Sequence, residues 1–168
     1  MNKGASRENG RQGGLRSHTD SSPMAARIAV AKADDPLQML VVSPPKGVDE
    51  PLRAALGPLR NVPGFVSAVI TRRDGLVIHH TFGRSRDAAG LSAMAAAMIG
   101  AARATGIELG KGLPEYGFFR FQEGVLLIQD AGPEALLACL LETDANIGYA
   151  IAKVTRVSQL IQETLAEF

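Results

Sequence analysis

Two adjacent histidines, His79 and His80, are the first candidates for chemistry, since imidazole binds metal ions and transfers protons. They lie in a run with the composition of a β-strand, in which neighbouring side chains point to opposite faces. The two rings therefore cannot hold one metal ion together, and the third histidine, His18, lies far away near the N-terminus. We expect no metal site here, and an enzyme that uses either histidine is a hypothesis without an indicated substrate.

The remaining candidate nucleophiles also lack the partners that catalysis needs. The single cysteine, Cys139, lies in the apolar run ALLACLLE, which indicates a buried thiol that forms neither a disulfide nor a zinc site. The glycine-rich GIELGKG, residues 106–112, lacks the GxxxxGK[ST] spacing of a phosphate loop. Serines 67, 85 and 92 lie in no G-x-S-x-G motif. We therefore predict a protein that is not an enzyme and carries no cofactor.

A pair of arginines, Arg72 and Arg73, precedes the turn signal Asp74-Gly75. Their guanidinium groups could contact an acidic partner or a phosphate, and a solvated turn is the alternative. The chain as a whole has 18 Lys and Arg against 17 Asp and Glu, a net charge of +1. Nucleic-acid binding is not indicated, because it needs clustered basic residues and aromatic side chains, and this sequence has no Trp and two Tyr.

The elements that position these residues follow from turn signals and from the spacing of apolar residues. Asp74-Gly75 predicts the turn of a β-hairpin, and Gly57-Pro58 weakens the helix that precedes it. Residues 135–141 are continuously apolar, which favours a central strand covered on both faces over a buried helix. The expected order is a helix from residue 49, the hairpin, a helix over 87–106, strands over 116–122, 125–130 and 135–141, and a last helix capped by Asp144 or Asn146. This order predicts an α+β sandwich.

The first 46 residues differ from the rest of the chain. Residues 1–23 are rich in Gly, Ser and Arg without an apolar cluster, which predicts disorder. The apolar run LQMLVV, 37–42, is either an extra strand or part of a linker, and Pro44-Pro45 marks the boundary of a domain over 47–168. The N-terminus has no secretory signal, and no apolar run reaches the roughly 18 residues of a membrane span. We expect a cytoplasmic protein.

The helix predicted at 87–106 has almost no polar face, since residues 93–102 are all Ala, Met, Ile or Gly. One face can cover the sheet, and the other needs a second cover. Small residues such as Ala97 and Ala101 allow two helices to approach closely, and Met94 and Met98 fill irregular gaps. We predict a dimer through this helix, the alternative being burial under residues 37–42 of the same chain.

Three stretches together resemble the Roadblock/dynein light-chain superfamily: VPGFVSAVITRRDGLVI, LSAMAAAMIGAA, and GVLLIQDAGPEALLACLLETDANIGYAIAKV. The resemblance covers residues 50–167. It implies a profilin-like sandwich with a five-stranded antiparallel sheet in the order 2-1-5-4-3 and helices on both faces. The long N-terminal extension departs from the family's pattern.

The resemblance also implies a partner. Members pair through the second helix and the third strand, which adds Phe119 and Phe121 to the predicted interface of Met94, Ala97, Met98 and Ala101. A homodimer or a heterodimer with a paralogue is implied, and bacterial and archaeal members typically regulate or dock small Ras-like GTPases. The leading hypothesis is therefore a dimeric scaffold for such a GTPase, with Arg72 and Arg73 as candidate contacts. The alternative is a small-ligand sensor, because related profilin, PAS and GAF folds are sandwiches of the same kind.

Overall fold

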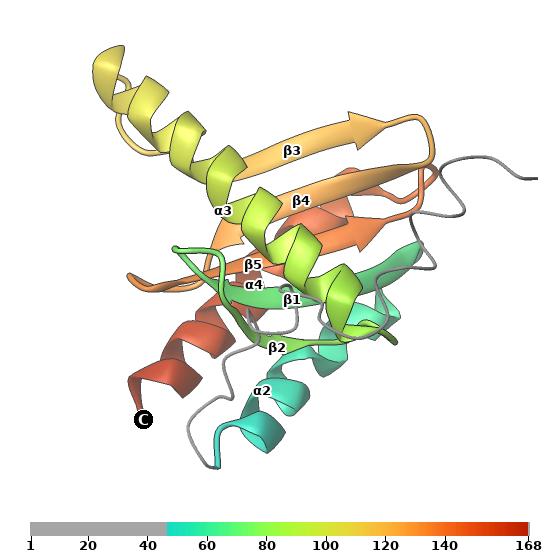
Figure 1. Cartoon of the computed structure of the whole chain (residues 1–168). Coiled ribbons are helices and arrows are strands. Elements are labelled where there is room, and N and C mark those ends of the chain that lie inside the picture. Colours follow the sequence, from blue (N-terminus) through green and yellow to red (C-terminus); the bar gives the residue numbers. More distant parts are fainter. Residues whose placement is uncertain (1–46, 168) are drawn as a thin grey trace, which may run out of the picture. The chain divides into compact units, whose positions relative to one another are not determined.

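The computed structural model describes residues 47–167, which form helices and strands in the predicted order (Figure 1). The predictions for residues 1–23 and 37–42 lie outside the described residues. The elements are α2 (Asp49–Leu56), the 3-10 helix η2 (Gly57–Asn61), β1 (Phe65–Arg72), β2 (Val77–His80), α3 (Ser85–Glu108), β3 (Tyr116–Phe121), β4 (Gly124–Asp130), β5 (Ala135–Leu141) and α4 (Ile147–Ala166).

The five strands form one antiparallel sheet in the order β2-β1-β5-β4-β3, which confirms the predicted fold. The continuously apolar β5 lies at the centre, paired with β1 on one side and β4 on the other. Its residues alternate between the two faces of the sheet, so that Leu137 and Cys139 face one hydrophobic layer while Leu136 and Ala138 face the other. The strand prediction for 135–141 is therefore confirmed, because burial on both faces requires apolar residues at every position.

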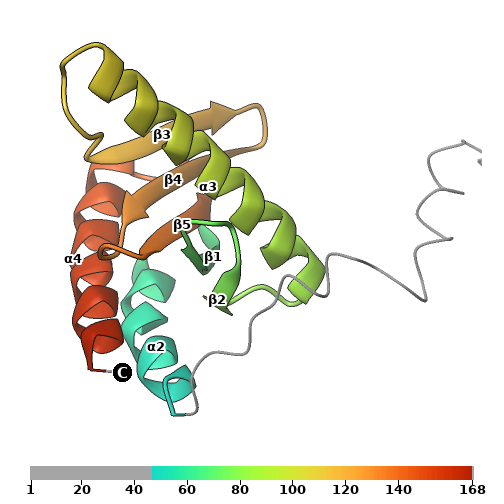
Figure 2. The ribbon, with the colours of Figure 1, turned by 60° about the vertical axis from the view of Figure 1, so that its left-hand side comes forward.

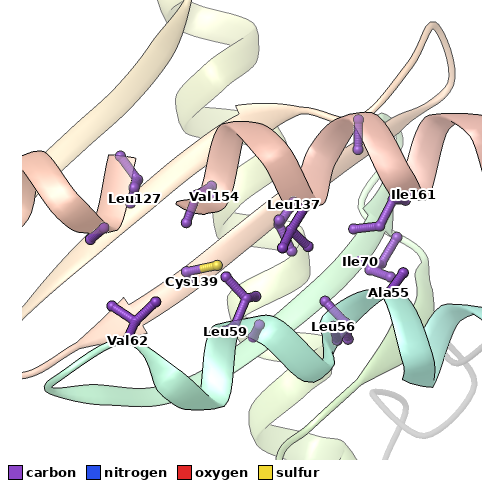
Figure 3. Packing of buried hydrophobic residues seen from close by; sticks show 14 of the residues in the cluster. Ala55, Leu56, Leu59, Val62, Ile70, Leu127, Leu137, Cys139, Val154 and Ile161 are labelled. Atoms are coloured by element: carbon purple, nitrogen blue, oxygen red, sulfur yellow. The ribbon is translucent and has the colours of Figure 1, made fainter. Parts of the chain in front are cut away.

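Helices α2 and α4 cover one face of the sheet, as Figures 1 and 2 both show. In this layer Leu56 and Leu59 meet Val154 and Ile161 over the strand residue Leu137 (Figure 3). The predicted weakness at Gly57-Pro58 appears as the change from α2 to the tighter turn η2, because proline has no N–H to continue the α-helical pattern. The turn carries the buried Leu59 into the core.

Helix α3 covers the opposite face of the sheet, with Ala88, Ala95 and Ile99 buried against strand residues such as Leu126 and Ile128. Its 24 residues span about 36 Å, more than the width of the sheet beneath it. The C-terminal end of α3 extends past β3, the edge strand (Figures 1 and 2). No residue from 100 to 113 is buried, and we call residues 100–108 the overhang of α3.

Two turns and one cap orient these elements. In the β1–β2 turn, Gly75 has a φ of 89°, and the side chain of Asp74 accepts a hydrogen bond from the N–H of Leu76 at 3.1 Å. A Cβ on Gly75 would lie 3.1 Å from the Cα of Ala93, so this turn also packs directly against α3. Of the two predicted caps for α4, Asn146 occupies the N-cap, where its side chain accepts a hydrogen bond from the N–H of Tyr149.

Candidate interaction surface

The outward face of α3 is apolar and uncovered by the described residues. Met94 is 65% exposed, and Ala97 and Ala101 on the same face are also exposed. Met98 is half-buried at the margin of this face, where it packs against the core beneath α3. These four predicted interface residues therefore lie along one side of a single helix, with the side chains of Met94, Ala97 and Ala101 free for contact.

The edge of the sheet beside the overhang is also apolar. Strand β3 has no further strand beyond it in residues 47–167, and its backbone groups on that side are free to pair. Phe121 is 53% exposed there, while Phe119 is half-buried and packs into the layer under α3. On the other face of this strand, Tyr116 and Phe118 are exposed as well. The uncovered edge and the uncovered helix face therefore lie next to each other.

Sequence reasoning missed the apolar tip of the overhang. Ile107 and Leu109 are 66% and 65% exposed, and Leu113 in the following loop is 53% exposed. The chain reverses there at Gly110, whose φ is 62°, and the carbonyl of Gly106 accepts a hydrogen bond from the N–H of Lys111 at 2.8 Å. The stretch GIELGKG is thus the C-terminal cap of α3. Its glycines were the available signal, because glycine is favoured where a helix ends.

The two arginines of the hairpin are used differently. Arg72 is exposed and forms an ion pair of 2.7 Å with Asp74. Arg73 turns inward, where its guanidinium donates to the carboxylate of Asp130 at 3.0 Å and to the backbone carbonyls of Gly132 and Pro133. Of the predicted pair, Arg72 is therefore the side chain that is accessible to a partner.

A second arginine reaches the same carboxylate from α3. Arg103 donates to Asp130 Oδ2 at 3.1 Å, while Arg73 donates to Oδ1. All three side chains are partly buried, with 26–36% of each side chain exposed. We call these three residues the Arg-Asp-Arg brace. The sequence did not predict it, because its members are separated by 27 and 57 positions along the chain.

The two histidines lie on opposite faces of the sheet, as predicted. His79 Nδ1 lies 3.4 Å from a carboxylate oxygen of Asp49 at the start of α2. His80 lies near Phe82 on the other face, and burial, together with the neighbouring His79, lowers its pKa below 6.5. Within residues 47–167, no group of three or more His, Cys, Asp or Glu side chains is placed to hold a metal ion. Cys139 is fully buried, and burial raises the pKa of its thiol.

One hollow of about 360 Å³ lies at the C-terminal end of α4, where Leu165 and Gln162 face the β4–β5 turn at Pro133. It shares no residue with α3 or β3, and it is more enclosed than a hollow of about 440 Å³ that Arg73, Arg103 and Asp130 help to line, which makes it the better candidate for a small-molecule site. By length and composition, α3 also resembles a membrane-spanning helix, the one such helix in the described part of the chain. That resemblance is weak evidence, since one face of α3 packs on the sheet of its own domain.

Comparison with known proteins places this geometry in a family. The model of the Roadblock/LC7 domain matches residues 53–141. Two uncharacterized proteins of Methanocaldococcus jannaschii are each 33% identical over 104 residues, which cover 62% of this chain and 90% of each of those proteins.

Solved structures share the fold. A Roadblock/LC7 domain from Streptomyces avermitilis superposes with a TM-score of 0.63 at 22% identity, over 74% of this chain and 99% of that one. The gliding protein MglB from Thermus thermophilus superposes with a TM-score of 0.66 at 20% identity, over 76% of this chain and all of that one (100%). Because the family model matches more than half of the sequence and the strand order agrees with it, the chain belongs to the Roadblock/LC7 family.

Proposed function

We propose that this chain is a cytoplasmic regulatory or scaffold protein that forms a homodimer and, as a pair, binds a small Ras-like GTPase. The observation that carries the dimer is the overhang of α3. An apolar helix face and an apolar strand edge, both uncovered by residues 47–167, meet at the same side of the sheet. A second copy related by a two-fold axis covers both, since such an interface is made from the same surface on each subunit.

In this arrangement the two β3 edges lie together and the two α3 helices pack against each other. Each overhang then covers the sheet of the other subunit, and Ile107 and Leu109 leave the solvent. Exposed aromatic rings at the seam, such as Phe121, add large apolar contacts. One related structure bears the description MglB with tetrameric arrangement, which supports assembly within this family without defining its form here.

The dimer is tested by placing a charge on the exposed face of α3. Ala97→Glu costs little in a lone protomer, because the new carboxylate stays in water, but it would be desolvated and unpaired in the seam. The matched control is Ala152→Glu, at an exposed position on α4. Light scattering should give twice the chain mass of 17.7 kDa for the unsubstituted chain and for Ala152→Glu, and the single mass for Ala97→Glu.

Two results would contradict this arrangement. A dimer that persists in Ala97→Glu would place the seam elsewhere on the molecule. A monomeric unsubstituted chain would rule out the homodimer and leave the heterodimer with a paralogue as the form to test.

The GTPase as partner rests on family membership. Regulation of its nucleotide state is tested by adding the dimer to a GTP-loaded Ras-like GTPase from the same organism and measuring both binding and hydrolysis. We expect Arg72→Ala to leave stimulated hydrolysis unchanged, because Arg72 is paired with Asp74 and Arg73 is held within the fold. A fall of about 10³-fold in Arg72→Ala would instead identify an arginine finger.

The second candidate function, a small-ligand sensor, is favoured by the hollow at the C-terminal end of α4. Its volume of about 360 Å³ lies at the small end of ligand sites, and Gln162 and Glu134 are the polar groups that line it. A small molecule that remains bound in native mass spectrometry, and is lost in Leu165→Arg, would favour the sensor.

A further inference from the structure

We propose that Asp130 sets the position of the overhang of α3 through Arg103, and thereby controls pairing through an ion pair within each subunit. This inference rests on the proposed dimer and adds to it a salt-sensitive control of the same interface.

The part of α3 that precedes the overhang is fixed by packing. Ala88, Ala95 and Ile99 are buried, and Ser92 forms a buried hydrogen bond with Thr71 of β1. The overhang, residues 100–108, has no buried residue, so apolar burial does not hold it against the rest of the domain. The side-chain hydrogen bond of Thr105 stays inside the helix, since it goes to the carbonyl of Ala101.

Within the described residues, the Arg103–Asp130 contact is the one side-chain hydrogen bond or ion pair that ties the overhang to the sheet. Arg103 follows Ile99 by one turn, so it extends the sheet-facing side of the helix and points away from the exposed Ala101. The contact is therefore well placed to fix the tilt of the overhang from the sheet-facing side of α3.

Asp130 is itself held in place from the other side. Arg73 donates to its second oxygen and is fixed by the carbonyls of Gly132 and Pro133, which join the β1–β2 turn to the β4–β5 turn. Arg73 thus holds the carboxylate of Asp130 in place, and that carboxylate in turn holds Arg103. Breaking the first contact perturbs the turns, whereas breaking the second frees the overhang.

This difference provides matched variants. Arg103→Gln removes the contact to α3 and leaves the Arg73–Asp130 pair, while Arg73→Gln removes the anchor and leaves Arg103–Asp130. Arg103→Lys keeps the positive charge, so its dimer dissociation constant should lie between those of Arg103→Gln and the unsubstituted chain. Each full-length variant is measured for dimer dissociation constant at several salt concentrations, for urea unfolding, and for amide hydrogen exchange over residues 100–108.

We expect Arg103→Gln to raise the dimer dissociation constant by about tenfold, the scale of one lost charge-assisted contact. The salt dependence of dissociation should become flatter, and the amides of 100–108 should exchange faster. Arg73→Gln should lower the urea midpoint while leaving the dissociation constant within about threefold of the unsubstituted value.

An unchanged dissociation constant in Arg103→Gln, together with unchanged exchange over 100–108, would overturn the proposal. Equal weakening of the dimer by Arg73→Gln and Arg103→Gln would also overturn it, because the brace would then act through overall stability. If the unsubstituted chain is monomeric, the proposed homodimer is wrong, but the role of Asp130 in positioning the overhang is still tested. Hydrogen exchange in Arg103→Gln then decides whether Asp130 positions the overhang.

Discussion

Thr71 and Ser92 form a buried hydroxyl–hydroxyl hydrogen bond that joins β1 of the sheet to the middle of α3. The Thr71 hydroxyl also lies 3.1 Å from the carbonyl of Leu76 and 3.0 Å from that of Arg72, next to the hairpin turn. The bond is polar in a layer that is otherwise made of Ala, Val, Leu and Ile. It therefore fixes the position of α3 along β1, which apolar packing between small side chains specifies poorly.

The cap of α3 should be sensitive to one added methyl group. A Cβ on Gly106 would lie 2.1 Å from the carbonyl oxygen of Gly112, so Gly106→Ala must displace the loop backbone. We expect a loss of about 1–3 kcal/mol in unfolding free energy, the usual cost of overpacking. Gly90→Ala is the control, since no atom lies within 4 Å of its added Cβ. Gly90→Ala should raise the unfolding free energy by about 0.5–1 kcal/mol. Urea unfolding measures both variants, and equal changes in unfolding free energy would contradict the cap geometry.

The start of α4 offers a direct comparison between two candidate caps. Asn146 accepts a hydrogen bond from the N–H of Tyr149 at 3.1 Å, whereas no side-chain hydrogen bond of Asp144 is found in the described structure. Asn146→Ala should therefore lower the unfolding free energy by about 0.5–2 kcal/mol, and Asp144→Ala should change it by less than about 0.5 kcal/mol. Thermal or urea unfolding of the two variants checks the assignment, which equal losses would refute.

His80 should make the fold less stable in mild acid. Burial and the neighbouring His79 lower the pKa of His80 below 6.5 in the folded protein, and its Nδ1 has no hydrogen-bond partner among the described residues. The unfolded chain therefore binds a proton at higher pH than the folded chain does. Stability from this group is lost as the pH falls from about 6.5, and the loss is complete below the folded pKa.

Urea unfolding between pH 5 and 8 measures this loss, and His80→Gln should flatten the profile in the acid range. His79→Gln is the informative comparison, because it removes both the neighbouring charge and the Asp49 contact. If the unfolding free energy of His80→Gln falls with decreasing pH as steeply as that of the unsubstituted chain, other groups cause the acid sensitivity.

The sequence predicted the strands and their order because the relevant signals are local or belong to a recognisable family pattern. Asp74-Gly75 specifies its own turn, and the continuous apolar run of β5 requires cover on both faces. The helix bounds were less accurate, since α3 runs from Ser85 to Glu108 and not from 87 to 106. Helix ends depend on capping contacts such as that between Gly106 and Lys111, which periodicity does not reveal.

The candidate surface was predicted only in part, because some of its features are local in the sequence and others depend on distant residues. The apolar face of α3 can be read from residues 93–102, but its overhang depends on the width of the sheet below it. The inward turn of Arg73 could not be predicted, because its acceptors Gly132 and Pro133 come from a turn 59 and 60 positions away. Nothing in Arg72-Arg73 distinguishes the arginine that faces solvent from the one that holds two turns together.

The edge of β3, which residues 47–167 leave uncovered, has a consequence for how the protein behaves in a cell. In a single protomer, the described residues leave an edge strand with exposed Tyr116, Phe118 and Phe121 beside an apolar helix face. Such an edge can pair with any extended chain, which makes it a template for aggregation. If the chain pairs as proposed, this edge is open to aggregation between synthesis and pairing, and cells that overproduce the protein should accumulate insoluble material when synthesis outpaces pairing.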